Sequence, residues 1–174
     1  GRLLIKLLTN GVSAVCMHTN LAAAKGGVND VLATVLKLID PGPLGDEEGL
    51  CRMGTLRKAV KLYDFAAFVA EALGCNGLRY ADAGRPVYRV AVGGGACAGE
   101  LARVAELGCD AFVTADVKYN GFADAVALGV TLIDAGHFET ENPVCGVLAQ
   151  KLRTQFPEIE VFVSKTHADP IRFV

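Results

Sequence analysis

Two segments place a histidine directly after a predicted strand and a second position of interest four residues later. The first holds His18 and Ala22, and the second holds His137 and Glu141. Imidazole and carboxylate groups are common ligands of divalent transition metals, and open α/β sheets bind ligands at the carboxyl ends of their strands. His137 and Glu141 are therefore candidate metal ligands, whereas Ala22 offers no ligand at the matching place.

The surroundings of His137 leave two interpretations open. Gly136 allows a ligand to approach closely, Asp134 lies just upstream, and Thr140 is a predicted helix cap. These neighbours favour a metal site. The structural alternative is that His137 bonds to a backbone carbonyl while Glu141, in a first helical turn, interacts favourably with the helix dipole.

A glycine-rich segment, GGGACAG at 93–99, follows a predicted strand and opens a predicted helix. Backbone N–H groups at a helix N-terminus suit an anion, and Gly93, Gly95 and Asp116 loosely fit a dinucleotide-binding fingerprint. A tight turn that needs glycine at positive φ accounts for the same residues without a ligand. Both interpretations stay open.

Cys97, in the same segment, is a candidate nucleophile, because a thiol near a helix N-terminus has a depressed pKa. His18 and His137 are its candidate bases, but no spacing brings either to it. The favoured interpretation is a buried structural cysteine. The six cysteines include no Cys-x-x-Cys pair and are expected to be reduced and mostly buried. His167 is expected in an exposed turn.

Short apolar segments alternate with helical patterns of about ten residues along most of the chain. This alternation predicts an α/β fold, with a mixed sheet of substantial parallel content flanked by helices. The predicted strands are 12–17, 88–92, 111–115, 131–136 and 160–164, and the predicted helices are 2–9, 28–39, 62–74, 100–108, 121–129 and 142–155.

Several signals mark the ends of these elements and the loops between them. Asn29 or Asp30 is expected to cap one helix and Asp64 another, with Gly74 ending the latter. A loop is expected over 41–48, which holds Pro-Gly-Pro and the acidic residues Asp46, Glu47 and Glu48. The basic residues between Arg52 and Lys61 are expected on a solvated face.

Composition limits the classes of protein that fit. The chain has 174 residues, 52% hydrophobic and 21% charged, which suits one compact domain over 1–174, with a candidate lobe boundary near 41–58. A net charge of −2 disfavours nucleic acid as a partner. No apolar run reaches the roughly 18 residues that cross a membrane, so a soluble, cytoplasmic protein is expected.

Four stretches give the chain a resemblance to the NIF-three-like family, whose members are also called GTP cyclohydrolase type-2 homologues or dinuclear metal-centre hexameric proteins. The resemblance implies a two-lobed α/β fold, a homohexamer, and a pair of divalent ions such as zinc, iron or manganese facing a central cavity. The N-terminal part of that fold is expected upstream of Gly1. The matching stretches are HTNLAAAKGGVND at 18–30, RVAVGGGACAGEL at 89–101, DAFVTADVKYN at 110–120 and LIDAGHFETE at 132–141, and the ending EVFVSKTHADP is similar as well.

The resemblance also implies which residues bind metal. His137 and Glu141 match two ligands in the family's GHxxTE-like motif. Ala22 stands where the HTNLD-like motif has an aspartate, and an N-terminal His-His pair is expected upstream. The site in this chain is therefore expected to be weakened or absent, unless Asp116 or Asp134 contributes.

A further stretch departs from the family pattern. Ala115 stands where glycine is usual, and Asn120 stands where histidine is common.

The leading hypothesis is a divalent-metal-binding protein of this family. Its parent activity would be metal-assisted hydrolysis of a nucleotide-like or phosphate-containing small molecule. The alternatives are a non-catalytic oligomeric scaffold with a degraded metal site, and a dinucleotide-binding domain.

Overall fold

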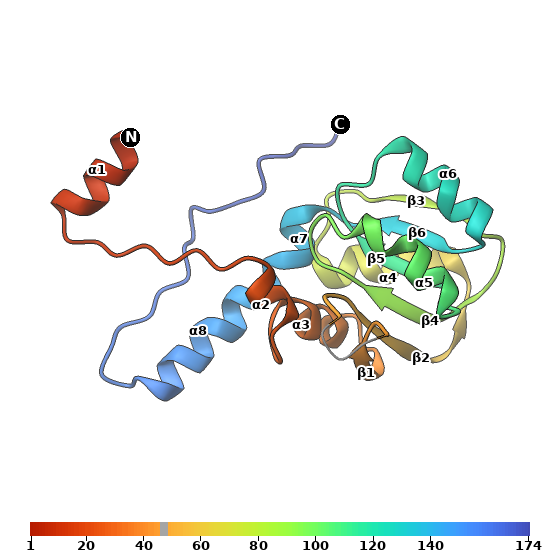
Figure 1. Ribbon diagram of the computed structural model, residues 1–174, viewed down its shortest axis with the longest axis horizontal. Coiled ribbons are helices and arrows are strands. Elements are labelled where there is room, and N and C mark those ends of the chain that lie inside the picture. Colours follow the sequence, from red (N-terminus) through yellow and green to blue (C-terminus); the bar gives the residue numbers. More distant parts are fainter. Residues whose placement is uncertain (46–48) are drawn as a thin grey trace.

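The computed structural model describes residues 1–45 and 49–174 and is built around a six-stranded mixed sheet (Figure 1). Two neighbouring pairs, β4 with β5 and β5 with β6, are parallel, and the other pairs are antiparallel. This confirms the predicted α/β class with its parallel content. In the sheet order β1-β2-β4-β5-β6-β3, the strands are β1 (Ile39–Pro43), β2 (Arg52–Val60), β4 (Val87–Val92), β5 (Ala111–Thr114), β6 (Thr131–Asp134) and β3 (Arg79–Ala81).

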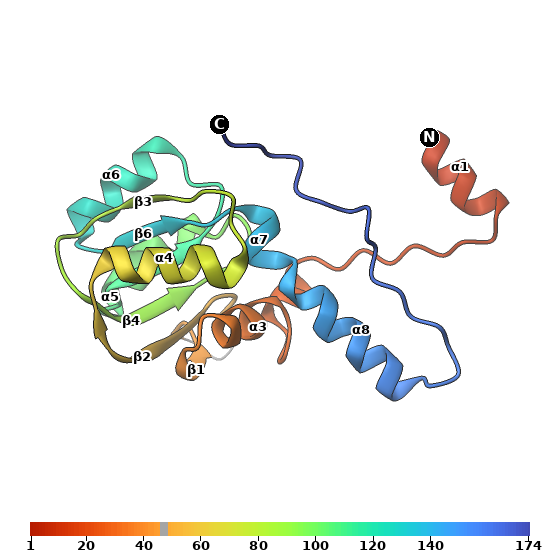
Figure 2. The same ribbon diagram turned by 180° about the vertical axis from the view of Figure 1, so that it is seen from behind.

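Helices cover both faces of the sheet. α3 and α4 lie on one face, and α5 and α6 lie on the other, as the two opposite views show (Figures 1 and 2). The helices are α1 (Arg2–Thr9), α2 (Thr19–Ala23), α3 (Val28–Val35), α4 (Leu62–Leu73), α5 (Leu101–Glu106), α6 (Tyr119–Leu128), α7 (His137–Glu141) and α8 (Pro143–Gln155), with a short 3-10 turn, η1 (Ala98–Glu100). Among the described residues, none of these helices is long and apolar enough to span a membrane.

The central strands are apolar on both sides, because side chains alternate between the two faces of a strand. Val90 and Val92 of β4 pack with Phe65 of α4, whereas the intervening Ala91 packs with Val104 of α5. This continuous burial is the reason that these strands could be predicted as short apolar runs. Gly74 also ends α4 as expected, with φ +69° in the left-handed region.

Two polar side chains from α3 and β2 are buried beside the sheet. The amide of Asn29 is fully buried, and its Nδ2 donates to the Leu50 carbonyl at 2.8 Å while its Oδ1 accepts from the Gly94 N–H at 2.7 Å. Arg52 is also buried, and its Nε donates to Asp30 Oδ1 at 2.5 Å. The expectation of a solvated Arg52 was therefore wrong, because its guanidinium is paired inside the protein.

The chain termini extend away from this body (Figure 1). Residues 12–17 and 160–164 were predicted as strands, but both are irregular, and no strand of the described chain pairs with either. A β-strand needs hydrogen-bonded neighbours, so apolar alternation alone did not make one here. The apolar face of α1 and side chains such as Phe162 are consequently exposed.

Other local expectations also need correction. Residues 41–43 belong to edge strand β1, where proline is tolerated because it costs no ladder bond, and Asp46, Glu47 and Glu48 lie outside the described residues. The N-cap of α3 is Gly27 and that of α4 is Lys61, neither with a side-chain cap bond, so Asn29, Asp30 and Asp64 are not caps. A lobe boundary near 41–58 stays a prediction.

Replacing Asn29 by Ala should lower the free energy of unfolding by about 2–4 kcal/mol, because the Gly94 N–H and the Leu50 carbonyl would lose their buried partner. Denaturant-induced unfolding measures this change. The matched control is Asn76→Ala, at an exposed position after α4, which should shift stability by less than about 0.5 kcal/mol. Equal effects of the two substitutions would contradict the role assigned to Asn29.

Candidate functional site

The carboxyl ends of the parallel strands β4, β5 and β6 meet at one edge of the sheet. The segment after β4 carries Gly95 and Cys97, the segment after β5 carries Asp116, and α7 begins with His137 shortly after β6. Parallel strands bring these positions together although they are far apart in sequence. The candidate site is therefore built from three separate turns.

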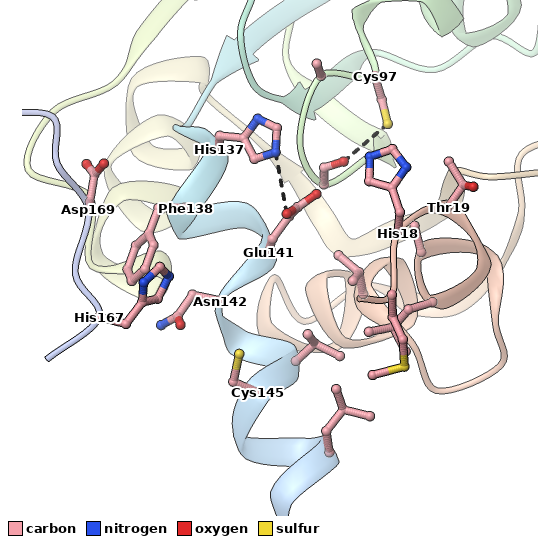
Figure 3. A pocket seen from close by; sticks show the side chains of 18 of the residues that line it. His18, Thr19, Cys97, His137, Phe138, Glu141, Asn142, Cys145, His167 and Asp169 are labelled. Atoms are coloured by element: carbon pink, nitrogen blue, oxygen red, sulfur yellow. Dashed lines mark hydrogen bonds and ion pairs between the residues drawn. The ribbon is translucent and has the colours of Figure 1, made fainter. Parts of the chain in front are cut away.

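His137 lies between two carboxylates. Its Nδ1 is 2.7 Å from Asp116 Oδ2. Its Nε2 is 3.5 Å from Glu141 Oε2, one helical turn further along α7 (Figure 3). The hydrogen bond with Asp116 raises the pKa of His137 above its ordinary value, and the charge of Glu141 raises this pKa further, while partial burial opposes both effects. The side chains of His137 and Glu141 are 47% and 41% exposed, so both can be reached from solvent.

Backbone geometry fixes Asp116 in its place. Its φ of +53° lies in the left-handed region, which aspartate adopts more readily than most non-glycine residues. The sequence had offered Asp116 as a ribose ligand or a contributor to a metal site, whereas here its carboxylate bonds to the ring of His137. The signal that could have found this role is its position at the carboxyl end of the strand next to β6.

Gly95 makes room for the His137–Glu141 pair. A Cβ at this glycine would lie 2.6 Å from Glu141 Oε1 and 3.0 Å from His137 Nε2, and its φ of +68° also disfavours a side chain. Its N–H donates to Thr140 Oγ1 at 3.0 Å, and the same hydroxyl donates to the Gly136 carbonyl at 2.8 Å. Thr140 therefore caps neither α7, whose N-cap is Gly136, nor α8, whose N-cap is Asn142, but joins α7 to the Gly95 turn.

Hydrogen bonds within the protein also decide whether the glycine-rich segment could bind an anion. The N–H groups of Gly94, Gly95 and Cys97 donate to Asn29, Thr140 and Thr114, respectively. An anion at this turn would have to replace these internal acceptors. The arrangement supports the structural interpretation, a tight turn that needs glycine. It leaves these three backbone N–H groups paired within the protein, so they are not free to bind the phosphates of a dinucleotide.

Both histidine segments line one cavity of about 650 Å³ (Figure 3). His18, the N-cap of α2, and Ala22 within α2 contribute to it, as do His137 and Glu141 of α7. The structure thus brings the two similar segments together, with the Ala22 methyl group where the first segment could have supplied a ligand. His167 is exposed as expected, and its ring also packs on Phe138 with centroids 5.2 Å apart.

Asp134 does not take part in this site. It is buried, its carboxylate pairs with Arg79, and it accepts hydrogen bonds from the N–H groups of Val117 at 3.0 Å and Gly136 at 3.2 Å. The expectation that Asp134 could supply a metal ligand was therefore wrong, since its oxygens hold the turns after β5 and β6. Throughout residues 1–45 and 49–174, no three His, Cys, Asp or Glu side chains gather around one possible metal position.

Cys97 lines the cavity but lacks the arrangement of an activated nucleophile. Its sulfur lies 3.3 Å from the Gly94 carbonyl, and the structure brings neither His18 nor His137 into a hydrogen bond with it among the described residues. The pKa of Cys97 is lowered chiefly by its interaction with the neighbouring Cys51 thiol. The helix N-terminus that the sequence suggested is thus not the main cause.

Comparison with known proteins assigns the family. The chain matches the family described as Duf34/NIF3 (NGG1p interacting factor 3) over residues 1–170. It is 30% identical over 181 aligned positions to a Clostridium perfringens protein named "GTP cyclohydrolase 1 type 2 homolog", covering 100% of this chain and 69% of that protein. It is 36% identical over 152 positions to a Nostoc protein of the same name, covering 84% of this chain and 58% of that one.

Solved structures agree with this comparison at the level of the fold. A Staphylococcus aureus hypothetical protein, SA1388, superposes with a TM-score of 0.89 at 23% identity, covering 99% of this chain and 72% of that one. Together with the match over residues 1–170, this likeness agrees with the resemblance noted in the four sequence stretches. The chain belongs to the Duf34/NIF3 family.

Proposed function

We propose that this chain forms part of a divalent-metal-binding protein in which His137 and Glu141 are metal ligands and Asp116 is a positioning residue. The observation that carries the proposal is the hydrogen bond between Asp116 and His137 Nδ1, which leaves Nε2 facing Glu141. Histidines that bind metals almost always donate their other ring N–H to a carboxylate, a carbonyl or water. The three side chains reproduce this pattern.

The donor set fits a divalent ion such as zinc, iron or manganese, but it supports weak binding. Catalytic zinc sites usually have three protein ligands, whereas His137 and Glu141 supply two donors here. Gly95 leaves the space beside both donors free of any side chain. The remaining coordination positions would be open to water or to a substrate.

When bound, a divalent ion would supply acidity to a coordinated water and polarise a scissile group, as in metal-dependent hydrolases. The protein's own contribution is to orient the His137 ring through Asp116 and to provide the negative charge of Glu141. The cavity of about 650 Å³ is within the usual range for small-molecule ligands. The name shared by the relatives supports a nucleotide-like or phosphate-containing substrate.

The proposed assembly is a homohexamer. Its support is the family resemblance together with the exposed apolar residues of α1 and of the C-terminal segment, including Leu3, Leu8 and Phe162. Exposed apolar side chains of this kind occur on surfaces that become buried against further protein.

A second candidate function is a non-catalytic scaffold with a degraded metal site. The observation that favours it is Ala22, which lines the cavity and has no atom that could bind a metal. The two candidates differ in whether the cavity holds an ion at all, and this difference can be measured.

The double substitution His137→Ala and Glu141→Ala should abolish specific Mn²⁺ binding, measured by calorimetry on protein treated with a chelator. Manganese is the suitable probe because it prefers oxygen and nitrogen donors and so avoids the exposed thiols of Cys16 and Cys145. His167→Ala, on the same cavity, is the matched control and should retain binding. Unchanged binding in the double variant would exclude these residues as ligands.

Replacing Ala22 by Asp should tighten Mn²⁺ binding by about tenfold or more, because it adds a third donor to the cavity wall. Ala96→Asp provides the control, since Ala96 is an exposed residue of the same cavity and its replacement by Asp adds the same charge. Equal gains in both variants would indicate a general charge effect. No gain in Ala22→Asp, with no binding in the parent, would favour the scaffold.

A further inference from the structure

Two thiols meet beneath the turn that follows β4. Cys51, directly before β2, is 1% exposed, and Cys97 is 8% exposed. A Cβ built on Gly93 would lie 2.6 Å from Cys51 Sγ and 3.2 Å from Cys97 Sγ. Both sulfur atoms therefore pack against the same side of one glycine, which brings them close to each other.

The two thiols differ in access and in acidity. Both belong to the core cluster with Leu44 and Leu101, but Cys97 lines the cavity and Cys51 does not. Interaction with the neighbouring Cys97 thiol raises the pKa of Cys51, and burial raises it further. Interaction with Cys51 lowers the pKa of Cys97. Cys97 is thus suited to attack an oxidant, and Cys51 to complete the reaction.

We propose that Cys51 and Cys97 are a redox-active dithiol that a low-molecular-weight disulfide converts to a Cys51–Cys97 disulfide. The Cys97 thiolate attacks one sulfur of the oxidant, the S–S bond of the oxidant breaks, and one thiol leaves after taking up a proton. Cys51 then loses its proton and attacks Cys97 Sγ, which releases the second thiol. Two protein thiols are oxidised and one small disulfide is reduced to two thiols.

This inference does not rest on the proposed metal ligands, although the two sites share a turn. The segment 93–97 touches the thiols through Gly93 and the His137–Glu141 pair through Gly95. Cys75 and Cys109 provide the contrast within the same protein. Burial raises the pKa of each of these thiols to about 11, and neither lines the cavity.

The test uses the chain with Cys16→Ser and Cys145→Ser, which removes the exposed thiols. Folded protein is incubated with oxidised glutathione, alkylated after denaturation, digested with trypsin and analysed by mass spectrometry. The expected product joins the tryptic peptides 38–52 and 90–103, with loss of two alkylatable thiols and full reversal by dithiothreitol.

Single substitutions in that background assign the two roles. Cys51→Ser should trap glutathione on Cys97, whereas Cys97→Ser should leave Cys51 unmodified. Cys109→Ser, which changes another buried cysteine of the same core cluster, should form the disulfide as the parent does. Thermal unfolding checks that each variant is folded. The proposal is overturned if the folded parent keeps both thiols reduced, carries glutathione on Cys97 with Cys51 free, or links other cysteines.

Discussion

The site depends on one buried amide. From α3, the side-chain amide of Asn29 hydrogen-bonds to two separate loops: it donates to the Leu50 carbonyl before β2 and accepts from the Gly94 N–H after β4. A buried backbone group needs a partner, and at Gly94 no strand provides one because β4 has already ended. By supplying that partner, Asn29 fixes the turn whose next residue, Gly95, leaves room for His137 and Glu141.

Two threonine hydroxyl groups hold the same turn after β4 through further hydrogen bonds. Thr114 donates to the Gly95 carbonyl at 2.9 Å, and Thr140 accepts from the Gly95 N–H at 3.0 Å. The turn after β4 is thereby tied to β5 on one side and to α7 on the other. Side chains held in this way are already organised, and such preorganisation would reduce the ordering cost of binding the proposed ion.

The sequence predicted what depends on local pattern and continuous burial. It located the central strands β4, β5 and β6, the principal helices α4 and α8, and the pair His137 and Glu141. It did not predict the role of Asp134, whose partner Arg79 is 55 residues away, or the burial of Arg52 beside Asp30. Such pairings depend on topology, which no local spacing reveals. The predictions of strands at 12–17 and 160–164 were wrong for the same reason, because a strand forms only beside a hydrogen-bonded neighbour that its own residues do not reveal.

Three successive glycines, 93 to 95, resemble a single motif, but a different neighbour excludes a side chain at each position. A Cβ on Gly93 would meet the two thiols, one on Gly94 would lie 2.7 Å from Val28 Cγ1, and one on Gly95 would meet the Glu141 carboxylate. The run is thus three independent steric constraints that happen to be adjacent. A descendant of this protein that lost both thiols would still need glycine at 93, because the Cβ of residue 97 would lie 2.7 Å from a Cβ at that position.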